Sequence, residues 1–336
     1  NYFITGGTGF IGTHLANLLH EVHPETRIYN LDIVEPGTPL PTVKNYKTAL
    51  RKGEEHAATF IYCDVRQPIE LEKVNITPED VIFNFAAVHR TPGHPDPAYF
   101  ETNIRGAENV CAFAERHGIR KIVFTSSIAP YGAAEELKEE TTLPMPNTPY
   151  GISKLVAEKI HQTWQAGGEG RQLTIVRPGV VFGRGENGNF TRLYWGIRGH
   201  KFMYPGRKDT IKACIYVKEL VRFMLYRLEH HDSGVELYNC CYEPAYTIEH
   251  IVESMKRVTN MKVKVPFMPG WLIMTAAGIA GALGSPMGIC PARVRKLQIS
   301  TNICGKKLAA SGYRFRYTFE EALADWYKDN GNLYLQ

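Results

Sequence analysis

Apolar positions in the first half of the chain alternate between short continuous runs and longer stretches with helical periodicity. The short runs predict buried strands over residues 3–5, 28–32, 59–63, 81–85, 121–125 and 173–177. The periodic stretches predict helices near residues 11–19, 97–117 and 150–165. Strands that are apolar throughout and alternate with helices are typical of a doubly wound parallel sheet covered on both faces, so the pattern predicts an α/β fold.

The pattern changes after residue 182, where glycine-rich loops and short helical stretches replace the alternation. A helix near 217–228 and a strand near 236–240 indicate a return to the sheet. We therefore predict one domain made of residues 1–182 and 210–242, and a smaller, mostly helical C-terminal substrate lobe made of residues 183–209 and 243–336. The apolar stretch at 271–283 is too short to span a bilayer, and we favour a buried or domain-packing helix there over a membrane-surface contact.

A glycine-rich turn lies between the first predicted strand and the first predicted helix. Gly6, Gly9 and Gly12 stand where side chains would block a tight turn, the approach of a pyrophosphate and the packing of helix on strand. The backbone amides of Phe10 and Ile11 at the helix start would face the phosphates, where the helix dipole favours negative charge. The turn therefore predicts a Rossmann-type dinucleotide site.

An acidic residue closes the second predicted strand. Asp32 lies twenty residues after Gly12, where its carboxylate can accept a hydrogen bond from a ribose 2′-hydroxyl and would repel a 2′-phosphate. No arginine follows it directly, so turn and acid together predict NAD rather than NADP, with Ile33 beside the ribose. A second glycine pattern at residues 183–188 lacks an acid at a strand end, and we favour a plain loop there.

Composition narrows the functional classes. The formal net charge of +5 is mild, and the one basic concentration, over residues 293–316, has no base-stacking aromatic pattern, which argues against a nucleic-acid partner. That cluster is either a solvated face or a polyphosphate contact. Seven scattered cysteines without a C-x-x-C pair indicate buried thiols in a reducing compartment, so we expect a cytoplasmic protein. Because the apolar stretch at 271–283 is too short to span a bilayer, no membrane span is expected. The histidines lack metal-ligand spacing, so no metal is expected.

Tyr150 and Lys154 lie four residues apart in the predicted helix that follows Pro149. Residues at this spacing share a helix face, so the phenol and the ammonium can point into one site. A tyrosine titrates at about 10, and a neighbouring lysine charge lowers that pKa toward the range that a general base needs. A second Tyr-x-x-x-Lys, at residues 204–208, contains a Pro-Gly turn and cannot place both groups on one face.

A hydroxyl group completes this set. Ser127 ends the run Phe124-Thr125-Ser126-Ser127 at the carboxyl end of a predicted strand, the edge where ligands of parallel sheets bind. There it can donate to a substrate oxygen and stabilise the charge that changes between alcohol and ketone. Serine pairs at strand ends are often only turn formers, and it is the combination with the glycine turn and the Tyr/Lys pair that predicts chemistry.

Together these residues resemble the extended short-chain dehydrogenase/reductase family, in particular its nucleotide-sugar epimerases and dehydratases. The resemblance covers most of the chain, and further motifs carry it: Cys63-Asp64-Val65, Asn84-Phe85-Ala86-Ala87, Asn103-Ile104-Arg105-Gly106, Asn147-Thr148-Pro149-Tyr150-Gly151-Ile152-Ser153-Lys154 and Arg177-Pro178-Gly179-Val180-Val181-Phe182-Gly183. It implies a cytoplasmic homodimer that binds NAD and a nucleotide-sugar substrate.

The resemblance also implies roles for individual residues. Asp64 and Val65 would hold the adenine, and Lys154 would bind the nicotinamide ribose as well as tune Tyr150. The cofactor groove would be lined by a further set: Phe85, Ala86, Ala87, Thr125 and Pro178. Asn103 would support the site from its helix.

Missing residues narrow the reaction. Ser127 is followed by Ile128-Ala129-Pro130, where dehydratases of this family carry an Asp-Glu pair and decarboxylases a Glu. Without that acid the site has only hydride chemistry, which suffices to invert a carbinol centre, so the resemblance implies an NAD-dependent 4-epimerase of a nucleotide-diphosphate hexose. A dehydrogenase or reductase of another alcohol or ketone, such as a 3-beta-hydroxysteroid, is the alternative, and an NAD-sensing protein is a third.

Substrate contacts are expected from the second lobe. Asn189 resembles the substrate asparagine of the family, and Arg293, Arg295 or Arg207 would supply the cation for the diphosphate. The usual Arg-x-x-Asp pattern is missing, because Lys296 stands three residues after Arg293. His89 and Arg90 would meet the sugar where the cofactor groove ends.

Overall fold

The computed structural model describes residues 1–336 except 39–49, 51–54, 90–92, 233, 273–274 and 276–297. Its main sheet has seven strands that all run parallel. Their spatial order is β12 (Val235–Cys240), β7 (Gln172–Pro178), β5 (Lys121–Thr125), β4 (Val81–Asn84), β1 (Tyr2–Thr5), β2 (Ile28–Asp32) and β3 (Thr59–Tyr62). The predicted α/β fold with a doubly wound parallel sheet is confirmed.

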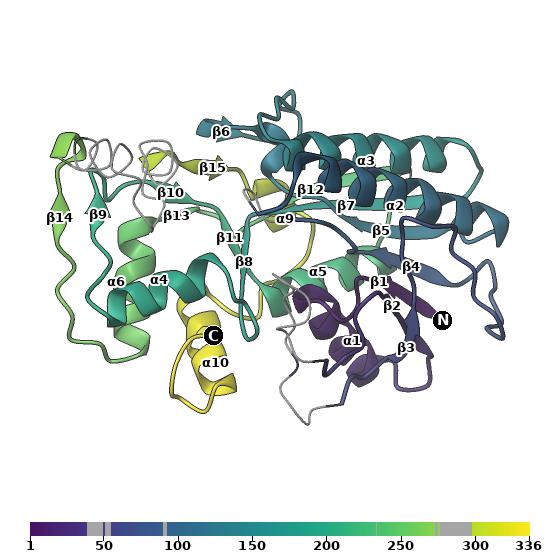
Figure 1. The fold of residues 1–336 in the computed structure, drawn as a ribbon, viewed down its shortest axis with the longest axis horizontal. Coiled ribbons are helices and arrows are strands. Elements are labelled where there is room, and N and C mark those ends of the chain that lie inside the picture. Colours follow the sequence, from purple (N-terminus) through teal and green to yellow (C-terminus); the bar gives the residue numbers. More distant parts are fainter. Residues whose placement is uncertain (39–49, 51–54, 90–92, 233, 273–274, 276–297) are drawn as a thin grey trace.

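Helices cover both faces of this sheet (Figure 1). One face carries α1 (Phe10–Val22) and α5 (Val217–Glu229), and the other carries α2 (Asp96–Arg116) and α3 (Pro149–Ala166). The strands are apolar on both sides because each face packs a separate buried cluster: Leu15, Leu19 and Met224 on one, Val110, Phe113 and Trp164 on the other.

The order of the strands reverses between β1 and β4. The chain builds β2 and β3 on one side of β1 and then crosses to the other side to form β4, β5 and β7. In open parallel sheets such a switch point leaves a crevice at the carboxyl ends of the strands. The glycine turn follows β1 and residues 85–87 follow β4, so the topology brings both predicted parts of the cofactor site to this crevice.

The remaining described residues form short strands and helices, many of them around an aromatic cluster that includes Phe182, Phe190 and Trp326. A four-stranded sheet has the order β13 (Tyr246–Thr247), β10 (Ile211–Lys212), β15 (Thr301–Ile303) and β6 (Ala134–Lys138). Two small pairs join β11 (Cys214–Tyr216) to β8 (Val180–Phe182) and β14 (Phe267–Met268) to β9 (Tyr204–Pro205). The helices here are η2 (Ala129–Tyr131), α4 (Asn189–Arg198), α6 (Ile248–Val258), α9 (Lys306–Ala309) and α10 (Phe319–Asp329).

These short strands were not predicted, because most of them have only two or three residues, which are too few to show an alternating pattern, and the five residues of β6 are mostly exposed. The proposed division at residues 182, 210 and 242 stays a prediction. None of the helices in the described ranges is long and apolar enough to cross a membrane. The apolar stretch at 271–283 lies mostly outside the described residues, but Trp271 and Leu272 at its start are exposed rather than buried.

Candidate active site

The glycine turn after β1 has no room for side chains. A Cβ on Gly6, whose φ is +70°, would lie 2.8 Å from the backbone nitrogen of Ala86, and one on Gly12 would lie 2.6 Å from the Cα of Gly7. Helix α1 then begins after Gly9 without a side-chain cap from any described residue and without an acid in its first turn. Uncapped amides at a helix start and a backbone stripped of side chains fit a pyrophosphate.

Asp32 is tied to this turn. Its carboxylate accepts hydrogen bonds from the backbone nitrogens of Thr8 and Val34, both at 3.1 Å, and the residue is only 5% exposed. The Thr8 hydroxyl in turn donates to the carbonyl of Val34 at 2.6 Å. These bonds fix the carboxylate at the end of β2 beside the glycine turn, which fits a ribose diol.

The other predicted cofactor residues lie along the same strand ends. Thr125 Oγ1 is buried without a hydrogen-bond partner among the described residues, so it is available to a ligand. Arg66 donates to both oxygens of Asp64 and keeps the pKa of that carboxyl below its usual value, and the adenine contact of Asp64 stays a prediction. Of the remainder, Val65 and Pro178 are buried, Phe85, Ala86 and Ala87 are half-buried, and Ile33 is exposed.

Tyr150, Lys154 and Ser127 meet at the carboxyl end of β5. Thr148 caps α3 by accepting from the backbone nitrogen of Gly151 at 3.1 Å, so Tyr150 stands in the first turn of the helix and Lys154 one turn later. Lys154 Nζ donates to the carbonyl of Thr125 at 2.8 Å. Ser127 and Tyr150 are hydrogen-bonded through their side chains. The phenol of Tyr150 therefore contacts the hydroxyl of Ser127, the residue that the sequence analysis grouped with it.

Burial sets the protonation of this site. It raises the pKa of Tyr150 to about 12, although the hydrogen bond with Ser127 opposes the rise. It lowers the pKa of Lys154 to about 7, and the carboxylate of Glu158 opposes that fall. The Lys154 ammonium is therefore poised near neutral pH, while the group that opposes the rise in the pKa of Tyr150 is Ser127.

Asn103, on α2, is hydrogen-bonded to two segments of the site, the loop after β4 and the first turn of α3. Its amide accepts from the backbone nitrogen of Val88 at 2.8 Å and donates to the carbonyl of the same residue at 3.0 Å. It also donates to Ser153 Oγ at 2.9 Å, and Ser153 donates to the carbonyl of Tyr150. These bonds fix the loop after β4 against the first turn of α3.

A buried ion pair below Lys154 was not predicted from the sequence. Glu158 accepts from Arg177 Nε at 2.8 Å and Nη2 at 2.6 Å, and from Ser126 Oγ at 2.5 Å. The side chains of Glu158 and Arg177 are 1% and 3% exposed. The spacing of Glu158, four residues after Lys154, was the available signal, because it continues the face that carries Tyr150.

The predicted substrate residues are only partly brought together. Arg207 is engaged by two carboxylates, Glu135 at 2.5 Å and Asp209 at 3.0 Å, so its charge is largely neutralised. Asn189 is exposed at the start of α4, and its carbonyl accepts from Arg192 at 2.8 Å. His89 is exposed near the end of the cofactor groove. Arg90, Arg293, Arg295 and Lys296 lie outside the described residues.

Lys212 is a cation that the sequence analysis missed. It lies in β10, one residue before Ala213, which packs in a small buried cluster with Ile128, the residue after Ser127. Its Nζ donates to the carbonyl of Ile299 at 2.7 Å, and burial lowers its pKa to about 8. A half-buried ammonium on this strand is suited to an anionic group of a substrate. The apolar strand β11 directly after it was the available signal.

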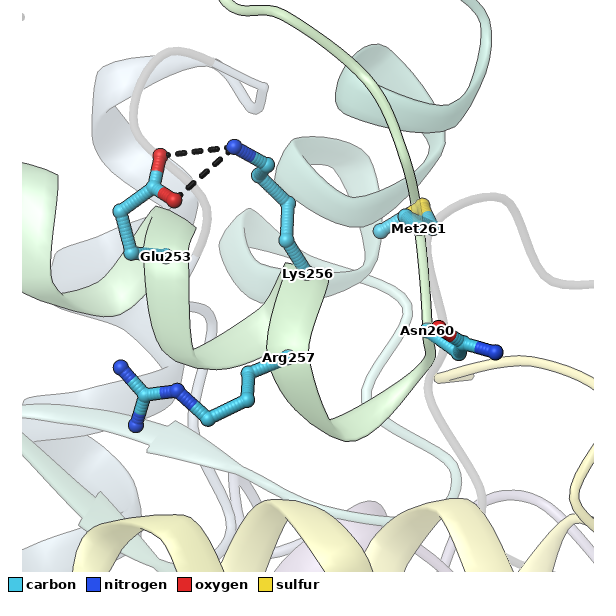
Figure 2. Close-up of a pocket in the computed structure, with 5 residues that line it drawn as sticks. All are labelled: Glu253, Lys256, Arg257, Asn260 and Met261. Atoms are coloured by element: carbon cyan, nitrogen blue, oxygen red, sulfur yellow. Dashed lines mark hydrogen bonds and ion pairs between the residues drawn. The ribbon is translucent and has the colours of Figure 1, made fainter.

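A hollow elsewhere in the molecule does not share these features. An open cavity of about 370 Å³ lies at the end of α6. Figure 2 shows the residues that line it: Glu253, Lys256, Arg257, Asn260 and Met261. Its cations are already paired, Lys256 with Glu253 and Arg257 with Glu320.

Within the described residues no cluster of His, Cys, Asp and Glu could hold a metal ion.

Comparison with known proteins yields one family. The model of the NAD dependent epimerase/dehydratase family matches residues 2–241. An enzyme of Escherichia coli O157:H7, N-acetyl-alpha-D-glucosaminyl-diphospho-ditrans,octacis-undecaprenol 4-epimerase, is 31% identical over 331 residues, which cover 96% of this chain and 93% of the relative.

Solved structures share the fold. UDP-N-acetylglucosamine 4-epimerase from Methanobrevibacter ruminantium M1, in complex with UDP-N-acetylmuramic acid, has a TM-score of 0.73 at 22% identity and covers 99% of this chain and 98% of its own. The UDP-glucose 4-epimerase of Thermus thermophilus, in complex with NAD, has a TM-score of 0.69 at 19% identity and covers 99% of both chains.

Proposed function

Because the chain belongs to the NAD dependent epimerase/dehydratase family, whose cofactor is the predicted NAD, we propose that it inverts C4 of a hexose carried on a diphosphate. The observation that carries the proposal is the meeting of Tyr150, Ser127 and Lys154 beside the glycine turn, with no acid in residues 128–130. Such a site can oxidise and re-reduce a carbinol, but it lacks the second acid/base group that elimination of water requires.

The residues divide the reaction between them. Tyr150 takes the proton of the 4-hydroxyl, and Ser127 donates a hydrogen bond to that oxygen as it becomes a ketone. Lys154 favours the phenolate by its charge. Bound NAD supplies the hydride acceptor and donor at C4. When the 4-keto sugar turns its other face, Tyr150 returns the proton and the epimer forms.

Two carriers fit this chemistry. A nucleoside diphosphate is the carrier that the sequence predicts and that the Methanobrevibacter and Thermus enzymes are named for. A polyprenyl diphosphate is the carrier in the name of the E. coli relative, whose similarity extends over nearly the whole chain. Both present the same diphosphate and the same sugar to the site, and the relative's name favours an N-acetylated hexose.

Sugar-resolved NMR tests the proposal. Purified protein is given UDP-, GDP-, dTDP- and CDP-hexoses and, in detergent, a polyprenyl-diphospho-N-acetylglucosamine, with NAD but no other redox partner. Appearance of the C4 epimer without net NADH supports the proposal and identifies the carrier. Net NADH formation from some other alcohol, with every sugar unchanged, would establish the dehydrogenase alternative instead.

Lys212→Met is expected to weaken substrate binding rather than chemistry. Hydrogen bonds to charged groups contribute about 1.5–3 kcal/mol, so KM should rise roughly 10- to 100-fold while kcat changes by less than about threefold. Lys328→Met, an exposed lysine on α10, is the matched control and should leave both constants unchanged. An unchanged KM for Lys212→Met would assign the diphosphate to another cation. Steady-state kinetics on the substrate found by NMR provides the measurement.

A further inference from the structure

Strands β14 and β9 lie at the end of the molecule opposite the N-terminus (Figure 1). Four residues on or beside these strands carry exposed apolar side chains. Phe267, Trp271, Leu272 and Ile299 are 51%, 72%, 41% and 39% exposed. We call these four residues the apolar tip. Large apolar side chains exposed together on a protein surface mark a contact site more often than a bare surface.

The segments that carry the tip flank the same turn. The backbone nitrogen of Gly206 donates to the carbonyl of Met268 at 2.9 Å. A Cβ on Gly206 would lie 2.9 Å from the Cα of Gly270 and 3.0 Å from Gln298 Nε2. Residues 267–272 and 298–299 therefore meet at Gly206 although they are far apart in the sequence.

Two basic residues lie directly behind the tip, Lys212 and the carboxylate-paired Arg207. Arg207 donates to the carbonyl of Gln298 at 3.4 Å, and Lys212 donates to the carbonyl of Ile299 at 2.7 Å. Lys212 is the residue that we assign to the diphosphate. A hydrocarbon chain attached to that diphosphate would therefore leave the site close to the apolar tip.

We propose that the apolar tip contacts the surface of an anionic lipid bilayer, in which the carrier of the substrate is dissolved. The inference rests on the polyprenyl-diphosphate form of the proposed function. Tryptophan and phenylalanine favour the boundary between headgroups and acyl chains, and lysines nearby favour anionic lipids. Lys262 and Lys264 are exposed on the segment that leads into β14, and the chain carries a net charge of +5.

Vesicle binding tests this contact with the full-length chain. Sedimentation with phosphatidylcholine vesicles that contain phosphatidylglycerol should bring down the unaltered protein, and pure phosphatidylcholine should bring down much less. Trp271→Ser should weaken binding to the anionic vesicles about tenfold, because one large apolar side chain no longer enters the interface. Trp195→Ser, which removes another exposed tryptophan far along the chain on α4, is the matched control and should bind like the unaltered protein.

The outcomes separate this inference from the proposed function. Epimerisation of a water-soluble sugar diphosphate should be the same in Trp271→Ser and the unaltered protein, since the tip lies outside the catalytic residues. If the unaltered protein binds no anionic vesicles, or if Trp271→Ser binds them equally well, the membrane contact is overturned even when epimerisation is observed. Sedimentation velocity tests whether a second copy of the chain, rather than a bilayer, contacts the tip. A dimer that dissociates in Trp271→Ser would assign the tip to that second copy and overturn the proposal.

Discussion

Tyr150→Phe is expected to lower kcat about 100- to 10,000-fold, the range that a positioned general acid/base contributes. The substitution removes only the phenol oxygen, which contacts Ser127 and to which we assign the substrate proton. The ring, packed 6.3 Å from that of Tyr99, stays in place, so NAD and sugar binding should change little. Single-turnover kinetics with the preferred sugar, combined with the KM value, separates the two effects.

The chain contains a matched control for this variant. Tyr204 belongs to the second Tyr-x-x-x-Lys pattern, and its hydroxyl is buried without a partner among the described residues. Removing that oxygen leaves no group unpaired, so Tyr204→Phe should keep full activity. If Tyr150→Phe retained more than about a tenth of the activity, the assignment of the base would be wrong. The comparison of the two variants also tests whether the helical context of Tyr150, rather than the Tyr-x-x-x-Lys pattern alone, makes it the base.

The regular part of the fold could be predicted because its signals are long and redundant. The strand at 28–32 and the strand at 121–125 were predicted with the bounds that the structure shows, and α1 and α3 differ from the predicted ranges by one to three residues. Buried parallel strands are continuously apolar, which is easily seen in a sequence. The strands around β10 were missed because their pairing depends on partners about 90 residues away in the sequence, such as Lys212 with Thr301.

The candidate site likewise contains residues that local spacing could predict and residues that it could not. The glycine turn, Asp32 and the Tyr/Lys pair were placed from local spacing, and in the structure they lie toward the same edge of the main sheet. Glu158 and Lys212 were not found, because a buried glutamate and a half-buried lysine look like surface charges until the segments packed against them are known. The engagement of Arg207 by Glu135 is likewise a contact between distant segments.

Glu158 links the catalytic helix to the sheet. It lies on α3 one turn after Lys154, and its carboxylate bonds Arg177 on β7 and Ser126 at the end of β5. The carboxylate also raises the pKa of Lys154 against the effect of burial. Glu158 is therefore a positioning residue that acts on stability and on the charge of the catalytic lysine.

Glu158→Gln is expected to lower the free energy of unfolding by about 3–5 kcal/mol, because it leaves the buried guanidinium of Arg177 without its counter-ion. Glu253→Gln breaks an exposed ion pair with Lys256 and should cost less than about 1 kcal/mol, so it controls for loss of an ion pair as such. Urea unfolding of both variants measures the difference.

If Glu158 had only a structural role, Glu158→Gln would lower stability and leave the pH profile of activity unchanged. The pH profile therefore distinguishes a structural role from an effect on Lys154. Without the carboxylate the pKa of Lys154 should fall below its value of about 7, since Glu158 is the group that opposes the lowering by burial. The ammonium then loses its proton at lower pH, and the alkaline loss of activity should move to lower pH in Glu158→Gln at a temperature where the variant is folded. Glu158→Asp keeps the charge and should restore the profile in part. An unshifted profile with the expected loss of stability would confine Glu158 to the fold and leave Lys154 tuned by burial alone.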